Sequence, residues 1–476
     1  MHRLRRIELL ALPLLCGLAV LAGCSDDHGA RGSEPVDTTP WAPGVVFRTP
    51  DDRTPGGFLD RRGLIHMHSV YSHDACDDMP VKDGVRDPVC FDDFRRGMCQ
   101  TRHDFIALTD HPSDFSRTEY PDALLYRPDL GDELVAGTTG ARASWAMCPD
   151  GERTLILAGT ESAEVMAIGL ERHVADTVEG RNAVYGSASD DAAATLRDNG
   201  AVVQVAHTEN WTPDQLRERD LNGFEMYNLH ANFLLPSALG KALQLIVRVG
   251  QGDPGLPHPD LLLLSIITED PAYLTRWGST LATGVRRVTT LGTDAHRNTL
   301  PILLEDGERV DSYRRLMLWF SNHLLIEPER DGSWDDRHVK EALRQGRLYG
   351  AFEVLGYPVG FDFHAKVARK MRAMGSEVAL GDDPVLEVSA PSVQNLAVDR
   401  EPPLVTVRLL RAIEGGFEEV ASGPGDLSFS PNLPGAYRAE VRILPLHLRE
   451  EMGADGNDLL SHDYVWIYSN PIYVRP

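Results

Sequence analysis

The sequence predicts an α/β protein with two folded parts: a large α/β domain and a smaller, β-rich C-terminal domain that we expect to be a sandwich. The chain has 476 residues, too many for one ordinary domain. Over residues 58–372, short apolar runs alternate with longer helix-compatible stretches, a pattern typical of α/β architecture. Over residues 373–476, the runs alternate or are β-branched, and Gly, Pro and Asn separate them.

Six apolar runs of the large domain predict strands. They span residues 63–68, 104–111, 154–161, 201–207, 223–228 and 287–296. Residues 190–200 predict a helix that ends at Gly200, because glycine readily takes a positive φ. Residues 234–283 form an apolar-rich helical insertion, interrupted by a Gly- and Pro-rich segment, that either covers the functional site or packs on a neighbouring element.

The second domain has predicted strands at residues 386–390, 404–412, 436–444 and 464–474. Its alternation specifies a fold and no ligand. We expect it to brace the large domain; polymer binding and contact with a partner are the alternatives.

The N-terminus has the pattern of an export signal. A basic start, MHRLRR, precedes an apolar stretch that ends in LAGC at residues 21–24. This resembles the bacterial lipoprotein signal, in which Cys24 is acylated and becomes the new N-terminus; a plain secretory signal or a membrane anchor is the alternative. We therefore expect a signal over residues 1–23 and a flexible tether over 24–57. Residue 25, which follows this cysteine, is Ser and not the Asp that often signals retention in the inner membrane. We therefore favour attachment to the outer membrane of the bacterial cell envelope.

The composition of the chain indicates which classes of binding partner to expect. Hydrophobic and charged fractions of 42% and 25% are ordinary for a globular protein, but the net charge is −24. Such a charge opposes binding to nucleic acid through a basic surface, so we expect no nucleic-acid partner.

Four cysteines remain after export: Cys76, Cys90, Cys99 and Cys148. In an oxidising compartment they predict two disulfides. Of the three possible connectivities we favour Cys76–Cys90 with Cys99–Cys148. A zinc site made of cysteines is the alternative, but no CxxC spacing is present.

The predicted strands of the large domain end alike, in His, Asp or Glu. The residues at these ends are His66, His68, His111, Glu161, His207, Asp294 and His296. Each alone has a simpler explanation, such as a packed histidine or a turn residue. In β/α barrels, however, functional residues gather at the C-terminal ends of the strands, and His and carboxylate ligands suit divalent metals. The common position therefore predicts a metal site.

The ordered motifs HMHSVYSHD, ALTDH, AGTES, VAH and GTDAH resemble the PHP (polymerase and histidinol phosphatase) superfamily over roughly residues 60–370. The resemblance implies a distorted (β/α)7 barrel with two or three divalent metals, commonly zinc, manganese or iron. It implies one metal on His66, His68, Glu161 and Asp294, a second bridged by Glu161 and held by His207, and a third on Asp74, His111 and His296. Asp74 is preferred to His73, since it lies eight residues beyond His66, where the family has its ligand.

The candidates for the remaining ligand of the second metal are Asn228 and His230. Glu225 is an alternative kind of residue here, one that orients a ligand from behind. A weaker resemblance, through LYGAFEVLGYPVGF (348–361) and SNPIYV (469–474), is to the PHP branch that includes carbaryl hydrolases.

These features predict a metal-dependent hydrolase. Closely spaced metals create a bridging hydroxide and stabilise the attacking and leaving oxygens. Glu161 and Asp294 would hold the metals that do this, and Arg297 is a candidate anion clamp, a surface role being as plausible. We expect a small-molecule ester substrate, with phosphoesters favoured. Carboxyl or carbamate esters are the first alternative, and a non-catalytic, surface-anchored metal- or ligand-binding protein is the second.

Overall fold

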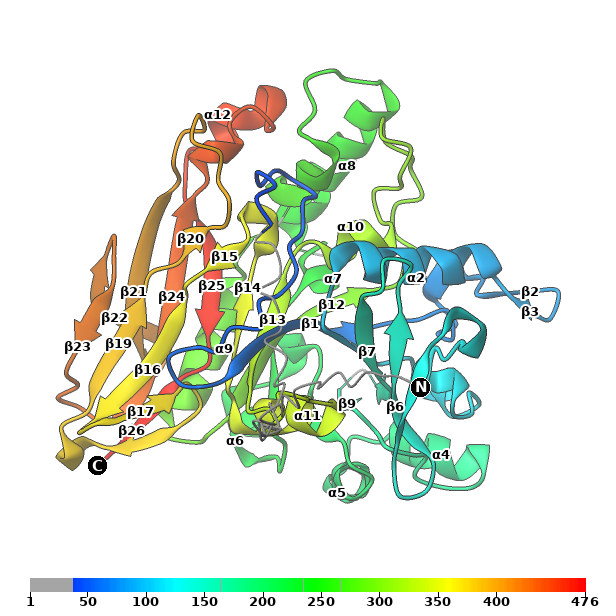
Figure 1. Cartoon of the computed structure of the whole chain (residues 1–476), viewed down its shortest axis with the longest axis horizontal. Coiled ribbons are helices and arrows are strands. Elements are labelled where there is room, and N and C mark those ends of the chain that lie inside the picture. Colours follow the sequence, from blue (N-terminus) through cyan, green and yellow to red (C-terminus); the bar gives the residue numbers. More distant parts are fainter. Residues whose placement is uncertain (1–36, 163, 234, 267) are drawn as a thin grey trace, which may run out of the picture. The chain divides into compact units, whose positions relative to one another are not determined.

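Strands and helices alternate through the first part of the chain, as the sequence predicts (Figure 1). The computed structural model describes residues 37–162, 164–233, 235–266 and 268–476, so the predicted signal and Cys24 lie outside the described residues. The strands up to residue 351 are β1 (Leu59–Met67), β2 (Val81–Lys82), β3 (Val85–Arg86), β4 (Phe105–Leu108), β5 (Glu133–Ala136), β6 (Ala141–Met147), β7 (Arg153–Leu157), β8 (Gly159–Glu161), β9 (Met166–Ile168), β10 (Val202–Val205), β11 (Gly223–Asn228), β12 (Val288–Ala295), β13 (Ser321–Ile326) and β14 (Leu348–Ala351).

All six predicted strands of the large domain are present, residues 154–161 as two short strands, β7 and β8. The α-helices are α1 (Ala75–Asp78), α2 (Pro88–Thr101), α3 (Pro112–Phe115), α4 (Val178–Tyr185), α5 (Asp190–Asp198), α6 (Pro213–Glu218), α7 (Leu229–Phe233), α8 (Pro236–Gly250), α9 (Pro271–Ala282), α10 (Tyr313–Met317), α11 (Asp336–Gln345) and α12 (Gly456–Leu459). The predicted helix at 190–200 is α5, and Gly200 follows it with φ +92°. Among the described residues, no helix is long and apolar enough to cross a membrane.

One large mixed sheet carries the strands that the metal prediction depends on. β1 is parallel to both β4 and β12, and β4 is parallel to β7. β8 pairs with β9 and β9 with β10, both antiparallel, whereas β10 pairs with β11 and β11 with β12, both parallel. Asp110, just after β4, forms a bridge with Thr160 of β8. The pairings therefore lead from β1 through these strands and back to β1.

The sheet branches at β1. The first half of β1 pairs antiparallel with β13, while its second half pairs with β12. From β13 the sheet continues through β14 into strands of the C-terminal region. The strands of the C-terminal region are β15 (Pro358–Val359), β16 (Asp362–Val367), β17 (Lys370–Ala373), β18 (Glu377–Ala379), β19 (Val385–Ser389), β20 (Ser392–Val393), β21 (Leu404–Ile413), β22 (Gly416–Gly423), β23 (Leu427–Phe429), β24 (Gly435–Leu444), β25 (Tyr464–Ser469) and β26 (Ile472–Arg475). Of these, β18, β21, β22, β24, β25 and β26 belong to the large sheet.

A smaller antiparallel sheet in the C-terminal region has the order β17–β16–β19–β23. The strands predicted at 386–390, 404–412 and 436–444 correspond to β19, β21 and β24, and 464–474 corresponds to β25 and β26. A domain boundary at residue 372 and a sandwich arrangement stay predictions.

Two asparagine side chains hydrogen bond to the main chain of β12 where the sheet branches. The Asn322 amide accepts from Leu291 N and donates to Leu291 O, both at 2.9 Å. The Asn470 amide does the same with Thr289, at 2.9 and 2.8 Å. Both asparagines are fully buried. Their amides satisfy the main-chain N–H and C=O groups of β12 along an edge where no described strand pairs with it.

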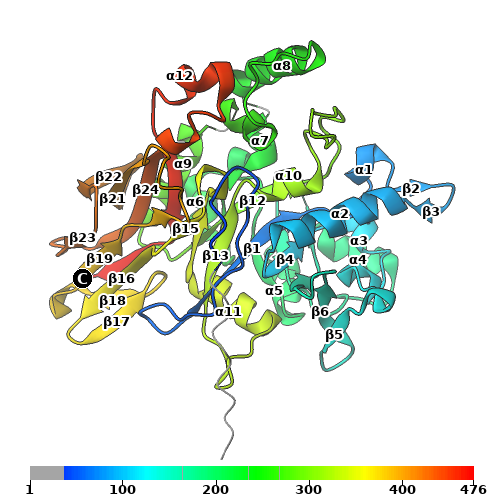
Figure 2. The same cartoon turned by 45° about the horizontal axis from the view of Figure 1, so that its top comes forward.

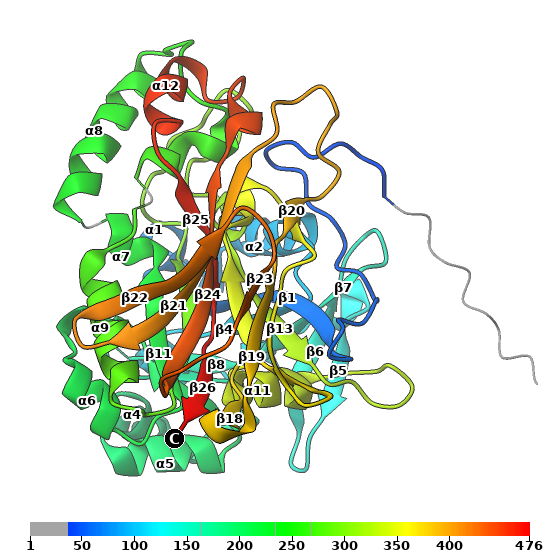
Figure 3. The same cartoon turned by 90° about the vertical axis from the view of Figure 1, so that its left-hand side faces the viewer.

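The insertion at 234–283 packs on a neighbouring element and also contributes to a cavity beside the candidate site. α9 packs against β21 and β22, which Figure 3 shows side by side. The approach is so close at Gly278 that a Cβ there would lie 1.9 Å from Gly416 O, which requires glycine. The 3₁₀ helix η4 (Pro259–Ser265) contributes Leu263 to a cavity beside the candidate metal centre.

Buried apolar side chains of β1, β4, β7, β9, β10 and β12 form one cluster with those of α11. On another face, α2 packs on α10 (Figure 2). The disulfides Cys76–Cys90 and Cys99–Cys148 are both present, which confirms the predicted pairing. Such bonds are typical of proteins that fold outside the cytoplasm.

Candidate metal centre

The strand ends that carry the predicted ligands have unusual backbone geometry. His66, His207 and Asp294 have φ values of 68°, 50° and 52°. The register of β1 shifts between Ile65 and Met67 against both β4 and β12, so His66 sits at a bulge. Non-glycine residues with positive φ are uncommon and cost about 1–3 kcal/mol each. Such strain concentrates at functional sites.

All nine predicted metal ligands come together in the structure. They form four overlapping groups whose ligand atoms lie within 4.8 Å of one another: His68, Asp74, His111 and His296; His66, Glu161 and His207; His66, His68 and Asp294; and His230, Asp294 and His296. Side chains from five strand ends (β1, β4, β8, β10 and β12), from α7 and from the loop after β1 thus converge on one place.

The first predicted metal position is the most deeply buried. His66 Nε2 and His68 Nε2 each lie 3.3 Å from Asp294 Oδ1, and His68 Nε2 lies 3.7 Å from Glu161 Oε2. All four side chains are at most 3% exposed. His66 Nε2, His68 Nε2 and Glu161 Oε2 are buried without a hydrogen-bond partner among the described residues. Buried polar atoms are normally bonded, so these three atoms point to a ligand that completes them.

The third predicted position distinguishes Asp74 from its neighbour His73. Asp74 Oδ2 lies 2.9 Å from His111 Nε2 and 3.1 Å from His296 Nε2. The His73 side chain is 62% exposed and pairs instead with Asp114 at 2.7 Å. Asp74 is therefore in the cluster and His73 is outside it.

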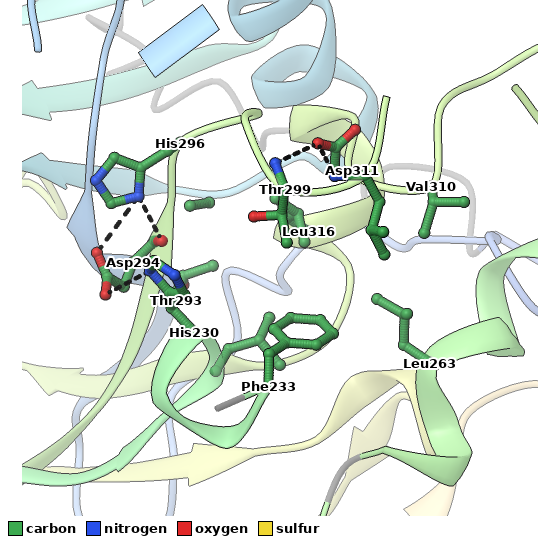
Figure 4. Close-up of a pocket in the computed structure, with 13 residues that line it drawn as sticks. His230, Phe233, Leu263, Thr293, Asp294, His296, Thr299, Val310, Asp311 and Leu316 are labelled. Atoms are coloured by element: carbon green, nitrogen blue, oxygen red, sulfur yellow. Dashed lines mark hydrogen bonds and ion pairs between the residues drawn. The ribbon is translucent and has the colours of Figure 1, made fainter. Parts of the chain in front are cut away.

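The second predicted position contains His207 and His230. His207 Nε2 lies 3.4 Å from both Glu161 Oε1 and Asp294 Oδ2, and His230 Nδ1 lies 3.2 Å from Asp294 Oδ2. Figure 4 shows dashed lines that connect Asp294 to both His230 and His296. Asn228, the alternative, is turned away and donates to Glu225 Oε2 at 3.2 Å. The geometry favours His230 over Asn228.

Hydrogen bonds at the Nδ1 atoms orient the histidines. His66 Nδ1 lies 2.6 Å from Glu225 Oε1, and His68 Nδ1 lies 3.1 Å from Ser72 Oγ. Ser72 donates to Asp74 Oδ1, so its oxygen accepts the proton of His68 Nδ1. His296 Nδ1 lies 2.9 Å from Asp294 O. Each bond places the proton on Nδ1 and leaves the Nε2 lone pair facing the cluster, as metal-binding histidines require.

Glu225 thus has the orienting position that the sequence predicts for it. Ser72 was not predicted, and no sequence pattern distinguishes it from other serines near a turn. Asp110 is also buried behind the cluster, where it accepts hydrogen bonds from Ser69 N and Ser69 Oγ at 2.6 and 2.7 Å.

The charges of the cluster are strongly coupled. Burial opposes the charged form, but Asp74 and Glu161 raise the pKa of His111 to about 11, and Glu161 and Glu209 raise that of His207 to about 10. In return, and against burial, the histidines lower the pKa values of Asp74, Glu161 and Asp294. Burial and His296 lower the pKa of His68 to about 3. Without metal, protons on the outer histidines balance the carboxylates, and a divalent cation can replace them.

Arg297 lies beside the cluster but has an acidic partner. Its Nε is 2.9 Å from Asp93 Oδ2, and its side chain is 13% exposed. The charge of Arg297 is therefore largely balanced within the protein, and its role as an anion clamp stays a prediction.

A narrow, mostly apolar cavity adjoins the cluster (Figure 4). His230, Asp294 and His296 line one side of it, while Phe233, Leu263, Val310 and Leu316 are among its apolar residues. This wall gives a bound molecule an apolar surface directly beside the candidate metal ligands.

The sequence matches no protein-family model and no curated protein. Among solved structures, the chain is similar to PsfC from Pseudomonas syringae PB-5123, with 13% sequence identity and a TM-score of 0.30. The matched region covers 57% of this chain and 84% of the PsfC chain. The description of the site thus rests on the residues themselves: buried His, Asp and Glu clusters that are compatible with a metal site.

Proposed function

We propose that this protein is a metal-dependent hydrolase of ester bonds, with phosphoesters as the favoured substrates, built on a barrel of the PHP type. The observation that carries the proposal is the set of buried, unbonded atoms on His66, His68 and Glu161, which converge on Asp294. The order of strand pairings, which leads back to β1, supports a closed barrel.

The residues present fit a site for two or three divalent ions. His66, His68, Glu161 and Asp294 would hold the first, Glu161, His207 and His230 the second, and Asp74, His111 and His296 the third. Mixed nitrogen and carboxylate ligands suit zinc, manganese or iron. At such a site divalent ions supply a water-derived nucleophile at neutral pH and stabilise charge on the oxygens of the reacting ester.

The chain's own groups would orient the reaction. Glu161 directs Oε2 towards His68 and His111 and Oε1 towards His207, so one carboxylate spans all three positions. Glu225 and Ser72 fix the rings of His66 and His68 from behind. The wall of Phe233 and Leu263 would exclude water from one side of a bound ester.

Hydrolysis of carboxyl or carbamate esters is the second candidate, and two observations favour it. The cavity beside the cluster is mainly apolar, and Arg297, the expected anion clamp, is paired with Asp93. An uncharged ester needs no additional cation, whereas a phosphate group gains from one.

A paired substitution tests the proposal. We expect the wild type to contain two or three equivalents of metal and to hydrolyse an ester from a panel of phosphate and carboxyl esters. His68→Ala should lose metal and at least a hundred-fold in activity. The matched control His73→Ala removes an exposed histidine from the same loop and should change neither. Full metal content with no turnover of any ester would instead support a binding protein, and a wild type without metal would refute the proposal.

The predicted location follows from the same reasoning. We infer export to the bacterial cell envelope with a lipid anchor at Cys24. The two disulfides support export, and the detection of a lipid-modified Cys24 by mass spectrometry would test the anchor.

A further inference from the structure

A second cavity, of about 170 Å³, lies between the segment before β1, the end of β13 and the hairpin of β16 and β17. Figure 1 shows this blue segment beside the yellow strands. Phe58 lines the cavity, and His66 lies further along β1. A strand rises about 3.3 Å per residue, so the cavity is on the order of 25 Å from the candidate metal centre. It is therefore a separate site.

Two arginines face this cavity without an acidic partner. Arg347 is half-buried; its Nε donates to Leu325 O at 3.2 Å, and its guanidinium carbon lies 5.2 Å from the centre of the Phe58 ring. Arg372, on β17, is exposed. In the part of the chain that the structure describes, neither guanidinium has a carboxylate within 4.0 Å.

The other ionisable groups of the lining, Asp362 and His364, contact each other. His364 Nδ1 lies 2.7 Å from Asp362 Oδ2, and its Nε2 lies 3.3 Å from Glu387 Oε2. Asp362 is the one acidic residue among those that line the cavity, all of which are described. Because two arginines stand against this single carboxylate, the lining carries a net positive charge.

This arrangement is unusual for so acidic a chain. The sequence has 71 acidic and 47 basic residues apart from histidine, so carboxylates are plentiful. A half-buried guanidinium without an ion-pair partner is destabilising, and burial lowers the pKa of Arg347 by more than the carboxylates of Glu327 and Glu341 raise it. Arg369, in the turn between β16 and β17, and Lys370, the first residue of β17, are both exposed and add positive charge nearby. Guanidinium groups bind phosphate through two parallel hydrogen bonds.

We propose that this cavity binds a phosphate group, held between Arg347 and Arg372. The group can come from a free phosphorylated molecule or from a lipid headgroup. At this distance from the metal cluster the phosphate is retained and does not react. The cavity would hold a ligand, or contact an anionic membrane surface, near the start of β1, whereas the candidate metal centre lies at the other end of this strand.

The test compares two exposed arginines of one hairpin. Arg372→Gln removes a residue that lines the cavity, while Arg369→Gln makes the same charge change outside the lining. Full-length wild type and both variants, at equal metal content, are titrated with inorganic phosphate by calorimetry. Phosphate that binds at metals contributes equally to all three, so the difference between variants is the readout. We expect about ten-fold weaker binding in Arg372→Gln and a change of less than about two-fold in Arg369→Gln.

Vesicles of phosphatidylcholine with and without phosphatidic acid distinguish the two sources. If Arg372→Gln abolishes binding to vesicles with phosphatidic acid and Arg369→Gln retains it, the phosphate group comes from a lipid headgroup. If the two variants differ in this way only with inorganic phosphate, the ligand is a free phosphorylated molecule. Two results would overturn the proposal: no phosphate or vesicle binding by the wild type, or equal losses in the two variants, which indicate a general charge effect.

Discussion

Replacement of Glu225 by Gln tests the idea that a buried carboxylate tunes the candidate metal centre from behind. Glu225 is fully buried, and all its neighbours donate hydrogen bonds to it: His66 Nδ1 at 2.6 Å to one oxygen, and His207 N and Asn228 Nδ2 at 3.3 and 3.2 Å to the other. A glutamine amide accepts at only one end. Whichever way it is turned, its NH₂ group faces a donor.

The expected loss follows from these contacts. One hydrogen bond to a charged group contributes about 1.5–3 kcal/mol, and loss of a group that orients a metal ligand weakens metal binding about 10- to 100-fold. We therefore expect Glu225→Gln to bind metal about 10- to 100-fold more weakly, measured by competition with a chelator of known affinity. Metal-dependent stabilisation in thermal unfolding should fall in parallel, by about 1.4–2.7 kcal/mol.

Two further variants make the result specific. A Cβ at Gly292 would lie 2.1 Å from Glu225 Oε1, so Gly292→Ala should displace the same carboxylate and weaken metal binding in the same direction. Glu171→Gln neutralises a carboxylate that pairs with Lys340 outside the cluster and should leave metal affinity unchanged. If folded Glu225→Gln binds metal within two-fold of the wild type, the orienting role is refuted.

Three other predictions concern the same region. Asp74→Ala should reduce the metal content by one equivalent while His73→Ala retains it; equal content by elemental analysis would show that the assignment is wrong. Because the pKa values of His111 and His207 are raised to about 11 and 10, the metal-free protein holds these protons at neutral pH and releases them when metal binds. Metal affinity should therefore rise with pH from 6 to 9, with proton release seen by calorimetry in two buffers, and a pH-independent affinity would argue against these ion pairs. The raised values also stabilise the metal-free protein fully below about pH 6.5, and this stabilisation is lost as the pH rises through about 10–11. Finally, the double variant Cys76→Ser with Cys90→Ser opens a loop with a sequence separation of 14 that follows Asp74, and should lose about 3 kcal/mol in chemical denaturation; unchanged stability would contradict a structural role for that bond.

The strand positions and the convergence of the His, Asp and Glu side chains at the strand ends could be predicted, because both depend on local sequence patterns. Each of these side chains lies at the end of a short apolar run, and parallel strands bring such ends together whatever the loops between them do. The cysteine pairing was predictable for a similar reason, since few connectivities exist for four cysteines.

The rest depends on contacts between distant residues. No local sequence pattern indicates that His66 lies at a bulge with positive φ. Regular alternation would place His66 and His68 on one face of a strand, whereas in the structure the strand is irregular at His66. The choice of His230 over Asn228 follows from Glu225, which occupies the Asn228 amide. The pairing of Arg297 with Asp93, on a helix some 200 residues earlier in the chain, has no sequence signal.

The amide of Asn470 links a residue of the C-terminal region to the strand that carries Asp294. That strand is fully hydrogen bonded only when Asn470 reaches Thr289, from which it is separated by 181 positions in the sequence. A chain that emerges N-terminus first from the ribosome or from an export channel therefore cannot complete β12 until Asn470 has emerged. If the protein is exported as we propose and takes up metal only when β12 is complete, its site would be loaded with the ions available outside the cytoplasm. The composition of that compartment, as much as the ligand set, would then decide which metal the protein contains.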